Sequence, residues 1–298
     1  MSTKTDKPIT LAGPSWKLYQ ADCLTGTSRF IKSGLPTLGV EDPPYNIGQG
    51  YASHVDRMRK EEFLYEFMQP RIVRAYEALH DLGSYWIAMN DDNVAEIKLI
   101  CEKAGFFLRK WVIWHYSFGQ HNSKNFTASH THWLYFSKHR TRYTFNALDP
   151  GVRIPSNRAT VYKDKRADPR GRLPDDVWVL RPQFVEPAPA ECLDTWFFSR
   201  ICGTFRAKAK SDDGTPIPNQ IPVPMLERII RVCSNPGDTV MDRFNGSGST
   251  GEACLLTGRN YIGMDISKGC LTFTQKRLTE TLGRAATEPV TKKGKKSK

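Results

Sequence analysis

The stretch DRFNGSGSTGEACLLTGRNYIGMD, residues 242–265, decides the fold of this 298-residue chain. It predicts the end of one strand, a glycine-rich turn, a helix and a second strand that ends in Asp265. Gly246, Gly248 and Gly251 match the pattern G-x-G-x-x-G, whose glycines let backbone N–H groups approach a ligand at a helix N-terminus. The acid that ends the next strand can accept hydrogen bonds from ribose hydroxyls. The stretch favours a nucleoside-containing cofactor over a turn that only packs a helix on a strand.

Strands and helices alternate through most of the remaining chain. Strands are predicted at 16–22, 38–40, 84–89, 106–115 and 132–138, and helices at 59–81, 93–105, 222–234 and 268–282. Such alternation is typical of an α/β fold with a mostly parallel sheet, helices on both faces and ligands at the carboxyl ends of the strands. Too little chain follows the glycine turn to complete two mononucleotide-binding halves. We therefore expect a Rossmann-like core that is circularly permuted.

One segment interrupts this alternation. Residues 145–215 are rich in Arg, Lys, Pro and Asp and show little periodicity, so they predict an insertion with a task of its own. The core is then divided into two halves, residues 1–144 and 216–284. Residues 285–298 should form a disordered basic tail.

Composition and charge limit the classes of function that are compatible with this chain. The net charge is +12, and the chain remains basic without its lysine-rich tail, which favours a polyanionic partner, nucleic acid first. No apolar run approaches the length of a bilayer span, and the N-terminus lacks the apolar segment of a secretory signal. The seven cysteines are scattered and contain no C-x-x-C pair, which argues against a disulfide scaffold and a zinc ribbon. We expect a cytoplasmic protein with no membrane partner and no metal.

A second polar landmark is Asp42-Pro43-Pro44-Tyr45. The two prolines cannot continue a central strand, so the strand must end there. Asp42 and the Pro43 carbonyl are neighbouring acceptors that could bind both hydrogens of an exocyclic amino group on a nucleobase. Such bonds draw the nitrogen toward tetrahedral geometry and restore its nucleophilicity, while Tyr45 offers a face for stacking. Taken alone, these four residues would also fit a turn with an aromatic plug.

The two landmarks together resemble the signature motifs of the amino-group DNA methyltransferases. DPPYNIG at 42–48 precedes the glycine stretch, which is the order of the β class of that family. Further segments that resemble family motifs are LYQADCL at 18–24 and residues 111–120, 125–138, 201–206 and 218–230. The resemblance covers most of the chain. It implies the Rossmann-like methyltransferase fold, S-adenosylmethionine (AdoMet) as cofactor and double-stranded DNA as substrate.

The resemblance also implies roles for particular residues. The catalytic corner would be Asp42, Pro43, Pro44 and Tyr45 in the first half of the core. Cofactor-binding residues would be Asp22, Cys23, Gln220, Asp242, Phe244, Gly246, Ser247, Gly248, Ser249, Thr250 and Asp265, with Asp22 on the adenine amino group. The chain departs from the family at Arg243, where proline is usual, and at Thr131, where Glu is frequent. Ile217, Asn219 and Ile221 also replace commoner residues around Gln220.

The insertion would be the target-recognition region, which grips phosphates and reads bases. Its predicted DNA-binding residues are Arg153, Arg158, Lys163, Lys165, Arg166, Arg170 and Arg172. A solvated charged surface is the alternative. His130 and His132 share one face of a predicted strand and could bind metal, but ordinary polar positions are expected. Asp175 and Asp176 fit a turn or helix cap better than an acid pair.

We therefore predict a site-specific enzyme that transfers a methyl group from AdoMet to N6 of a flipped adenine in double-stranded DNA. A leading Asp in the D-P-P-Y motif favours adenine, whereas a leading Ser is commoner for N4 of cytosine, and cytosine stays open. An NAD-dependent oxidoreductase, a non-catalytic nucleic-acid-binding module and an RNA substrate also stay open. Restriction-modification partners and homodimers are known in the family, and the sequence decides neither a restriction endonuclease partner nor a homodimer.

Overall fold

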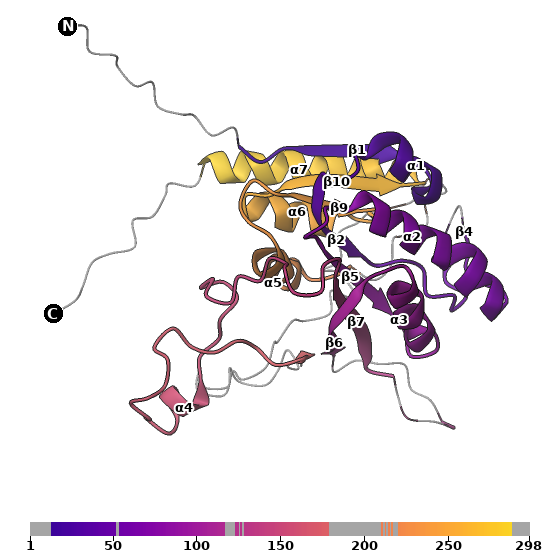
Figure 1. Cartoon of the computed structure of the whole chain (residues 1–298). Coiled ribbons are helices and arrows are strands. Elements are labelled where there is room, and N and C mark those ends of the chain that lie inside the picture. The colour runs from indigo at the N-terminus through magenta and orange to yellow at the C-terminus, as the bar shows by residue number, and fades with distance from the viewer. Residues whose placement is uncertain are drawn as a thin grey trace, which may run out of the picture.

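The structure is a computed structural model of the chain. It describes residues 13–51, 54–116, 123, 124, 126, 128–178, 210, 212, 214, 216 and 220–287. Through these residues runs one eight-stranded sheet with the order β1-β10-β9-β2-β5-β7-β6-β8 (Figure 1). Its strands are β1 (Trp16–Gln20), β2 (Pro36–Glu41), β5 (Ser84–Met89), β6 (Phe107–His115), β7 (His130–Ser137), β8 (Val177–Trp178), β9 (Thr239–Asp242) and β10 (Asn260–Asp265). β7 is antiparallel to both neighbours and the other pairs are parallel, which confirms the mostly parallel sheet.

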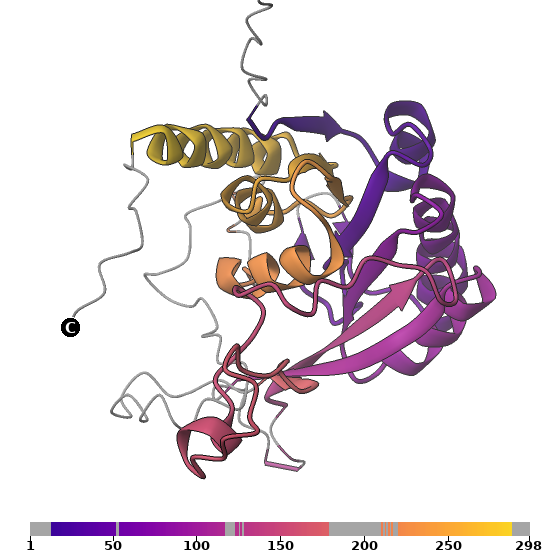
Figure 2. The same cartoon turned by 60° about the vertical axis from the view of Figure 1, so that its left-hand side comes forward.

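Helices cover both faces of the sheet, as predicted. One face carries α1 (Cys23–Phe30), η1 (Glu62–Met68), α2 (Gln69–Ala78) and α3 (Val94–Lys103), and the other carries α5 (Val223–Cys233), α6 (Ser249–Leu256) and α7 (Lys268–Thr287). Figure 2 shows this second group in orange and yellow. Alternate strand residues feed two apolar clusters, with Val40 and Ala88 in one and Ile87 and Leu134 in the other. Each face of the sheet is thus buried under its own helices.

Pro70 explains why the helix predicted over 59–81 is irregular in the structure. Proline has no N–H to donate, so a regular helical ladder cannot pass through it. The chain forms the wide π-helix η1 instead, in which the N–H of Gln69 bonds to the carbonyl of Leu64, and Pro70 then lies in the first turn of α2.

The strand order confirms the permuted core. β9 and β10 come late in the chain, yet they lie between β1 and β2. β2 and β9 pair in parallel with Gly39 opposite Met241, and their following helices pack on opposite faces. Neighbouring strands whose crossovers leave on opposite faces form a topological switch point, where α/β sheets bind ligands.

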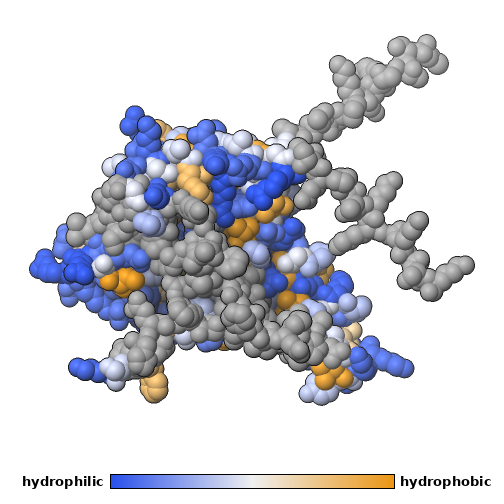
Figure 3. Space-filling model, turned by 180° about the vertical axis from the view of Figure 1, so that it is seen from behind, coloured by the Kyte–Doolittle hydropathy of each residue, from blue (hydrophilic) through white to orange (hydrophobic). Residues whose placement is uncertain are grey.

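Three short elements were not predicted: the hairpin of β3 (Gly50–Tyr51) and β4 (His54–Val55), the strand β8, and α4 (Asn157–Thr160) in the insertion. Within the insertion, α4 lies away from the core (Figure 1), whereas Val152 packs in the core and β8 pairs with β6. Seen from behind, hydrophobic side chains lie in separate patches among hydrophilic ones (Figure 3). Among the residues that the structure describes, no helix has the length and apolar character needed to cross a bilayer.

Candidate active site

Four neighbouring strands end at one edge of the sheet, and a predicted site residue follows or ends each of them. Asp22 follows β1, Asp265 ends β10, Phe244 follows β9 and Asp42 follows β2. The register places these ends side by side, since Gln20 lies opposite Asp265. Residues from both ends of the chain therefore meet at one carboxyl edge.

The glycine turn leaves space for a ligand at one position. Gly246 and Gly248 both have positive φ, 50° and 74°. A Cβ at Gly248 would lie 2.5 Å from the side chain of Thr274, so packing against α7 requires glycine there. A Cβ at Gly246 would meet only the carbonyl oxygen of Phe244, at 3.8 Å. The backbone at Gly246 is therefore open to close approach, as a nucleoside cofactor requires.

Two side chains hold the glycine turn from behind. Asn245 donates from Nδ2 to Oγ1 of Thr274 at 2.8 Å, and its Oδ1 accepts the hydroxyl hydrogen of Tyr261 at 2.9 Å. Arg277 of α7 donates to the carbonyl of Ser247 at 3.0 Å. Arg277 was missed in the sequence because nothing near it marks a link to a turn thirty residues earlier.

Asp265 joins the turn to the next strand. Its Oδ2 accepts the N–H of Gly246 at 2.8 Å, and its Oδ1 accepts the N–H of Ser267 at 2.9 Å. Burial raises the pKa of Asp265, while these backbone hydrogen bonds oppose the rise. A carboxylate oxygen can accept more than one hydrogen bond, so Asp265 can bind ribose hydroxyls as well.

Asp22 has a partner that the sequence did not suggest. Its Oδ1 caps α1 by accepting the N–H of Leu24 at 2.7 Å, and its Oδ2 accepts from Nη2 of Arg71 at 2.6 Å. The Arg71 guanidinium also lies 3.9 Å from the centre of the Phe67 ring. The Asp22 side chain remains 44% exposed, so it can receive a further donor such as an amino group.

Asp242 supports the glycine turn, and further predicted cofactor residues have buried side chains. Asp242 accepts the N–H of Phe244 at 3.0 Å, and burial raises the pKa of Asp242 to about 7. This carboxyl group supports the turn from below. The other predicted residues with buried side chains are Cys23, Gln220, Ser247, Ser249 and Thr250. Their contacts with a cofactor stay predictions.

The D-P-P-Y corner stands at the end of β2. The hydroxyl of Tyr45 donates to Oδ1 of Asp42 at 2.5 Å. Burial raises the pKa of Asp42 to about 6, and the hydrogen bond from Tyr45 opposes that rise. Pro43 is buried and Pro44 is partly buried. Asp42 is therefore ionised at neutral pH and can accept hydrogen from an amino group.

Two further residues brace this corner. Asn93, which precedes α3, donates from Nδ2 to the carbonyl of Tyr45 at 3.1 Å. The buried carboxylate of Asp56 accepts the N–H groups of Asn46, Ile47 and Gln49 at 2.8, 3.1 and 2.9 Å. These contacts fold the loop after the corner. They were not predicted, because an isolated Asp or Asn carries no local pattern.

A cluster of Asp91, His130 and His132 lies at the carboxyl end of β5. Oδ1 of Asp91 is 2.7 Å from Nε2 of His132 and 3.0 Å from Nε2 of His130. The indole N–H of Trp111 donates to Nδ1 of His132 at 2.9 Å. A neutral imidazole has one N–H, so the hydrogen of His132 lies on Nε2, the nitrogen that a metal would need. Burial lowers the pKa of His132. Asp91, His130 and His132 each offer one ligand atom, and these atoms lie within 4.8 Å of one another, so the cluster could hold a metal ion, and the expected absence of a metal stays a prediction.

Arg153 has an internal role in the insertion. Its guanidinium donates to the carbonyls of Ala147 and Arg170 at 2.9 and 3.1 Å, and to the carbonyl of Gly171. It also contacts Asp168 at 3.3 Å, and its side chain is 11% exposed. Arg153 therefore stabilises the insertion, and its side chain has little exposed surface for the predicted contact with DNA.

Several other predicted DNA-binding residues are held by acids but remain exposed. Arg158 and Arg166 share Asp164, at 2.6 and 3.1 Å. The remaining exposed members of the predicted set are Lys163, Lys165 and Arg170, and Arg172 is partly buried. Their DNA contacts stay predictions. Most of the second half of the insertion lies outside the described residues.

Two adjacent acids near the middle of the insertion do not act as a pair. Asp176 binds Nζ of Lys110 at 2.8 Å, and its backbone carbonyl accepts the N–H of Ile113. Asp175 lies 3.5 Å from Arg172. Both acids therefore serve local ion pairs and strand pairing.

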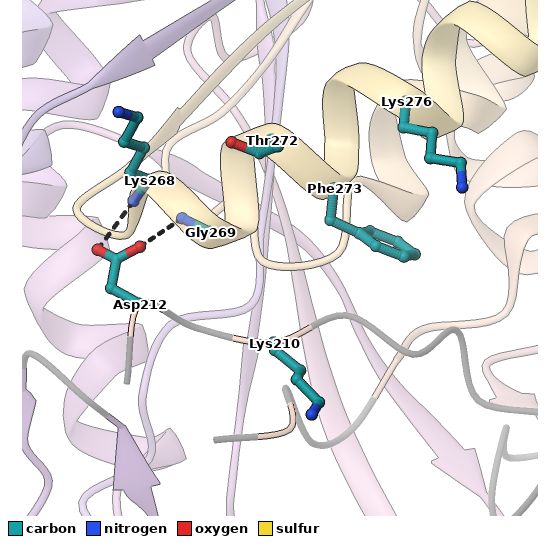
Figure 4. Close-up of a pocket in the computed structure, with 7 residues that line it drawn as sticks. All are labelled: Lys210, Asp212, Lys268, Gly269, Thr272, Phe273 and Lys276. Atoms are coloured by element: carbon teal, nitrogen blue, oxygen red, sulfur yellow. Dashed lines mark hydrogen bonds between the residues drawn. The ribbon is translucent and has the colours of Figure 1, made fainter. Parts of the chain in front are cut away.

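A pocket of about 520 Å³ lies along the first turns of α7 (Figure 4). Its lining residues are Lys210, Asp212, Lys268, Gly269, Thr272, Phe273 and Lys276. Asp212 accepts the N–H groups of Lys268 and Gly269, at 3.1 and 2.5 Å, and so caps the helix. This carboxylate satisfies the helix N-terminus, which leaves a shallow lysine-rich recess beside the cofactor edge.

Comparisons with known proteins add to this geometry. A family model described as DNA methylase matches residues 37–276. The Type II methyltransferase M1.MboII of Moraxella bovis is 30% identical over 252 residues, which cover 84% of this chain and 92% of that relative. The DNA adenine methyltransferase YhdJ of Escherichia coli K12 is 29% identical over 240 residues, which cover 80% of this chain and 74% of YhdJ. The Type II methyltransferase M.HpaI of Haemophilus parainfluenzae is 29% identical over 80% of this chain and 67% of its own length.

Solved structures share the fold. The complex of M1.HpyAVI with SAM superposes with a TM-score of 0.54 and 18% identity, covering 88% of this chain and all of that one. The PvuII DNA methyltransferase, which is cytosine-N4-specific, gives a TM-score of 0.60 and 14% identity, covering 91% of this chain and 93% of its own. At these identities the likeness confirms the predicted Rossmann-like methyltransferase fold.

Proposed function

Because this chain belongs to the N6/N4 DNA methylase family, we propose that it transfers a methyl group from AdoMet to N6 of a flipped adenine in double-stranded DNA. One observation carries the proposal. Asp42 and the open glycine turn at Gly246 follow adjacent parallel strands, β2 and β9, at the same edge of the sheet. An amino group held by Asp42 and a cofactor held at Gly246 would therefore be neighbours.

The described residues fit AdoMet. Gly246 offers an open backbone, and Asp265 and Asp22 offer acceptors for ribose hydroxyls and an adenine amino group. When bound, AdoMet supplies a methyl group on a positively charged sulfur, which a nitrogen lone pair can attack. These residues would orient the cofactor and leave the chemistry to the groups at the end of β2.

The corner at the end of β2 would prepare the base. Asp42 accepts one amino hydrogen and the Pro43 carbonyl a second, which localises the nitrogen lone pair toward the methyl group. Tyr45 gives up its hydrogen bond to Asp42 and presents its ring to the flipped base. The carbon–nitrogen bond forms as the carbon–sulfur bond breaks, and the nitrogen then loses a proton. No covalent bond between enzyme and base is needed.

Adenine is the finer part of the proposal. The leading Asp42 of the motif and the similarity to YhdJ, which is named an adenine methyltransferase, support it. The likeness to the cytosine-N4-specific PvuII enzyme keeps N4 of cytosine as the alternative. Family membership removes the reason for the NAD-dependent alternative, because the family model already accounts for the glycine pattern.

Mass spectrometry of nucleosides tests the base and the reaction together. DNA from cells that express the chain is digested and compared with DNA from cells that express the Asp42→Ala variant. We expect N6-methyladenine only with the unaltered chain. N4-methylcytosine instead would overturn the choice of base, and unmethylated DNA from a chain that binds AdoMet would favour the non-catalytic module. A parallel digest of RNA would expose the alternative substrate.

The insertion is the region that we expect to contact DNA, through the exposed guanidinium groups of Arg158, Arg166 and Arg170 and the lysines between them. Relatives named Type II methyltransferases support a restriction-modification role with an endonuclease that acts on the same site. A cytoplasmic location and a homodimer stay predictions from the sequence.

A further inference from the structure

Glu41 and Arg243 form a buried ion pair between the two motifs. Nε of Arg243 lies 2.5 Å from Oε1 of Glu41, and Nη2 lies 2.9 Å from Oε2. Both side chains are 1% exposed. Two parallel hydrogen bonds between planar groups fix orientation as well as distance, which a single contact would not do.

The position of the pair in the sheet is informative. Gly39 lies opposite Met241, so Glu41 and Arg243 come next on the same face, at the ends of β2 and β9. Glu41 directly precedes Asp42 of the catalytic corner. Arg243 directly precedes Phe244, where the glycine turn begins. The pair is therefore the last contact between these strands before β2 continues into the catalytic corner and β9 continues into the glycine turn.

Neighbouring elements hold each partner from outside. The Tyr85 hydroxyl on β5 donates to Oε2 of Glu41 at 2.7 Å. Nη1 of Arg243 donates to Oγ1 of Thr27 on α1 at 3.3 Å. The resulting network runs from α1 through β9 and β2 to β5, directly below the site.

Stability alone gives a weak reason for such a pair. Moving two charges from water into the protein interior costs about as much free energy as their attraction contributes. Well-packed apolar residues can therefore often replace a buried ion pair without loss of stability. A role in geometry is the better explanation for two charges at this point.

We propose that Glu41 and Arg243 are positioning residues that fix the catalytic corner relative to the glycine turn, an inference that rests on the proposed methyl transfer. Methyl transfer needs donor and acceptor atoms in line at close range, and a shift of about 1 Å can cost about 100-fold in rate. Neither residue needs to touch cofactor or base. Loss of the pair should therefore lower kcat and leave the binding of each ligand nearly intact.

The test uses the full chain with both partners replaced, because a single replacement would leave a buried charge unpaired. The Glu41→Leu/Arg243→Met variant should fold, bind AdoMet and DNA within about threefold of the unaltered chain, and lose about 10- to 100-fold in kcat. Arg243→Lys keeps the positive charge but cannot donate two parallel hydrogen bonds from a planar group, so it should give an intermediate kcat.

Arg259→Met is the matched control. Arg259 is also a buried arginine, but it donates to the carbonyl of Ser234 at 2.7 Å near the opposite end of β9 and β10. This control should lower the unfolding temperature and leave kcat unchanged. A double variant with unaltered kcat would overturn the proposal, as would a loss of kcat that only follows a loss of AdoMet binding. Production of N4-methylcytosine would contradict the choice of adenine but leave this rate comparison intact.

Discussion

The hydroxyl of Tyr45 donates a hydrogen bond to Oδ1 of Asp42, with 2.5 Å between the two oxygens. The acceptor that the reaction requires is thus already engaged, by the residue expected to stack on the base. We propose that an incoming amino group takes the place of the phenol hydrogen, and that the tyrosine ring then turns to stack on the base. Such an exchange would couple entry of the base to preparation of the carboxylate.

Tyr45→Phe should shift the pH dependence of the reaction. The variant keeps an aromatic face but removes the hydrogen bond that lowers the pKa of Asp42, so this pKa should rise above about 6. For the unaltered chain, kcat/KM should increase with pH and level off above about 6, because only the carboxylate accepts the amino hydrogen. In the variant the midpoint of this rise in kcat/KM should lie at higher pH, as measured by methyl transfer from labelled AdoMet. An unmoved midpoint would show that the phenol does not tune Asp42.

Asp42→Asn should separate binding from chemistry. The amide has only one acceptor oxygen and no charge, so methyl transfer should fall at least about 100-fold. Among the described residues no hydrogen bond or ion pair joins Asp42 to the glycine turn, so AdoMet affinity should stay within about threefold. Calorimetry with AdoMet and a single-turnover assay measure the two quantities. Equal losses in both would argue that Asp42 belongs to the cofactor site.

The same variant should stabilise the cofactor-free protein at high pH only. Burial raises the pKa of Asp42 to about 6 in the folded state, above the ordinary value of 3.8, so the folded state holds this proton more tightly than the unfolded state. The stability contributed by the protonated group is complete below about 3.8 and is lost as pH rises through about 6. Asp42→Asn should thus unfold at a higher temperature than the unaltered chain at pH 8, with little difference at pH 3. An equal rise in unfolding temperature at pH 8 and at pH 3 would contradict the raised pKa of Asp42.

The two glycines of the turn should respond differently to alanine. Gly246→Ala places a methyl group in open space at positive φ, so it should cost only about 1–2 kcal/mol of stability but weaken AdoMet binding about tenfold or more. Gly248→Ala brings a Cβ to 2.5 Å from Thr274 and should mainly lower the unfolding temperature. Thermal unfolding and AdoMet titration on both variants check this contrast. Stronger cofactor loss at Gly248 than at Gly246 would reverse the assignment.

Arginines of the insertion should divide into two kinds. Arg166→Ala removes an exposed charge, so DNA affinity should fall and the slope of affinity against salt should decrease by about 1. Arg153→Ala removes a guanidinium that binds three backbone carbonyls, so it should destabilise the insertion. DNA titrations at several salt concentrations, together with limited proteolysis, distinguish the two. An Arg166 variant with an unchanged salt slope would remove that residue from the DNA-binding set.

Local sequence determined the longer helices and strands and the two motifs. The strand end at Asp42 follows from two prolines that cannot join a ladder, and the turn at Gly246 follows from glycines that tolerate positive φ. Each depends on residues within a few positions of itself. The permuted order also followed, because it depends only on how much chain remains after the glycine turn.

Tertiary structure alone decided how these parts work together. It paired Glu41 with Arg243, Asp22 with Arg71, and the glycine turn with Arg277. The physical reason is that these contacts join residues far apart in the chain, whose meeting depends on strand order and helix placement. Hydrophobic periodicity records which face of an element is buried, but it does not record which buried or polar group from a distant element will lie against it.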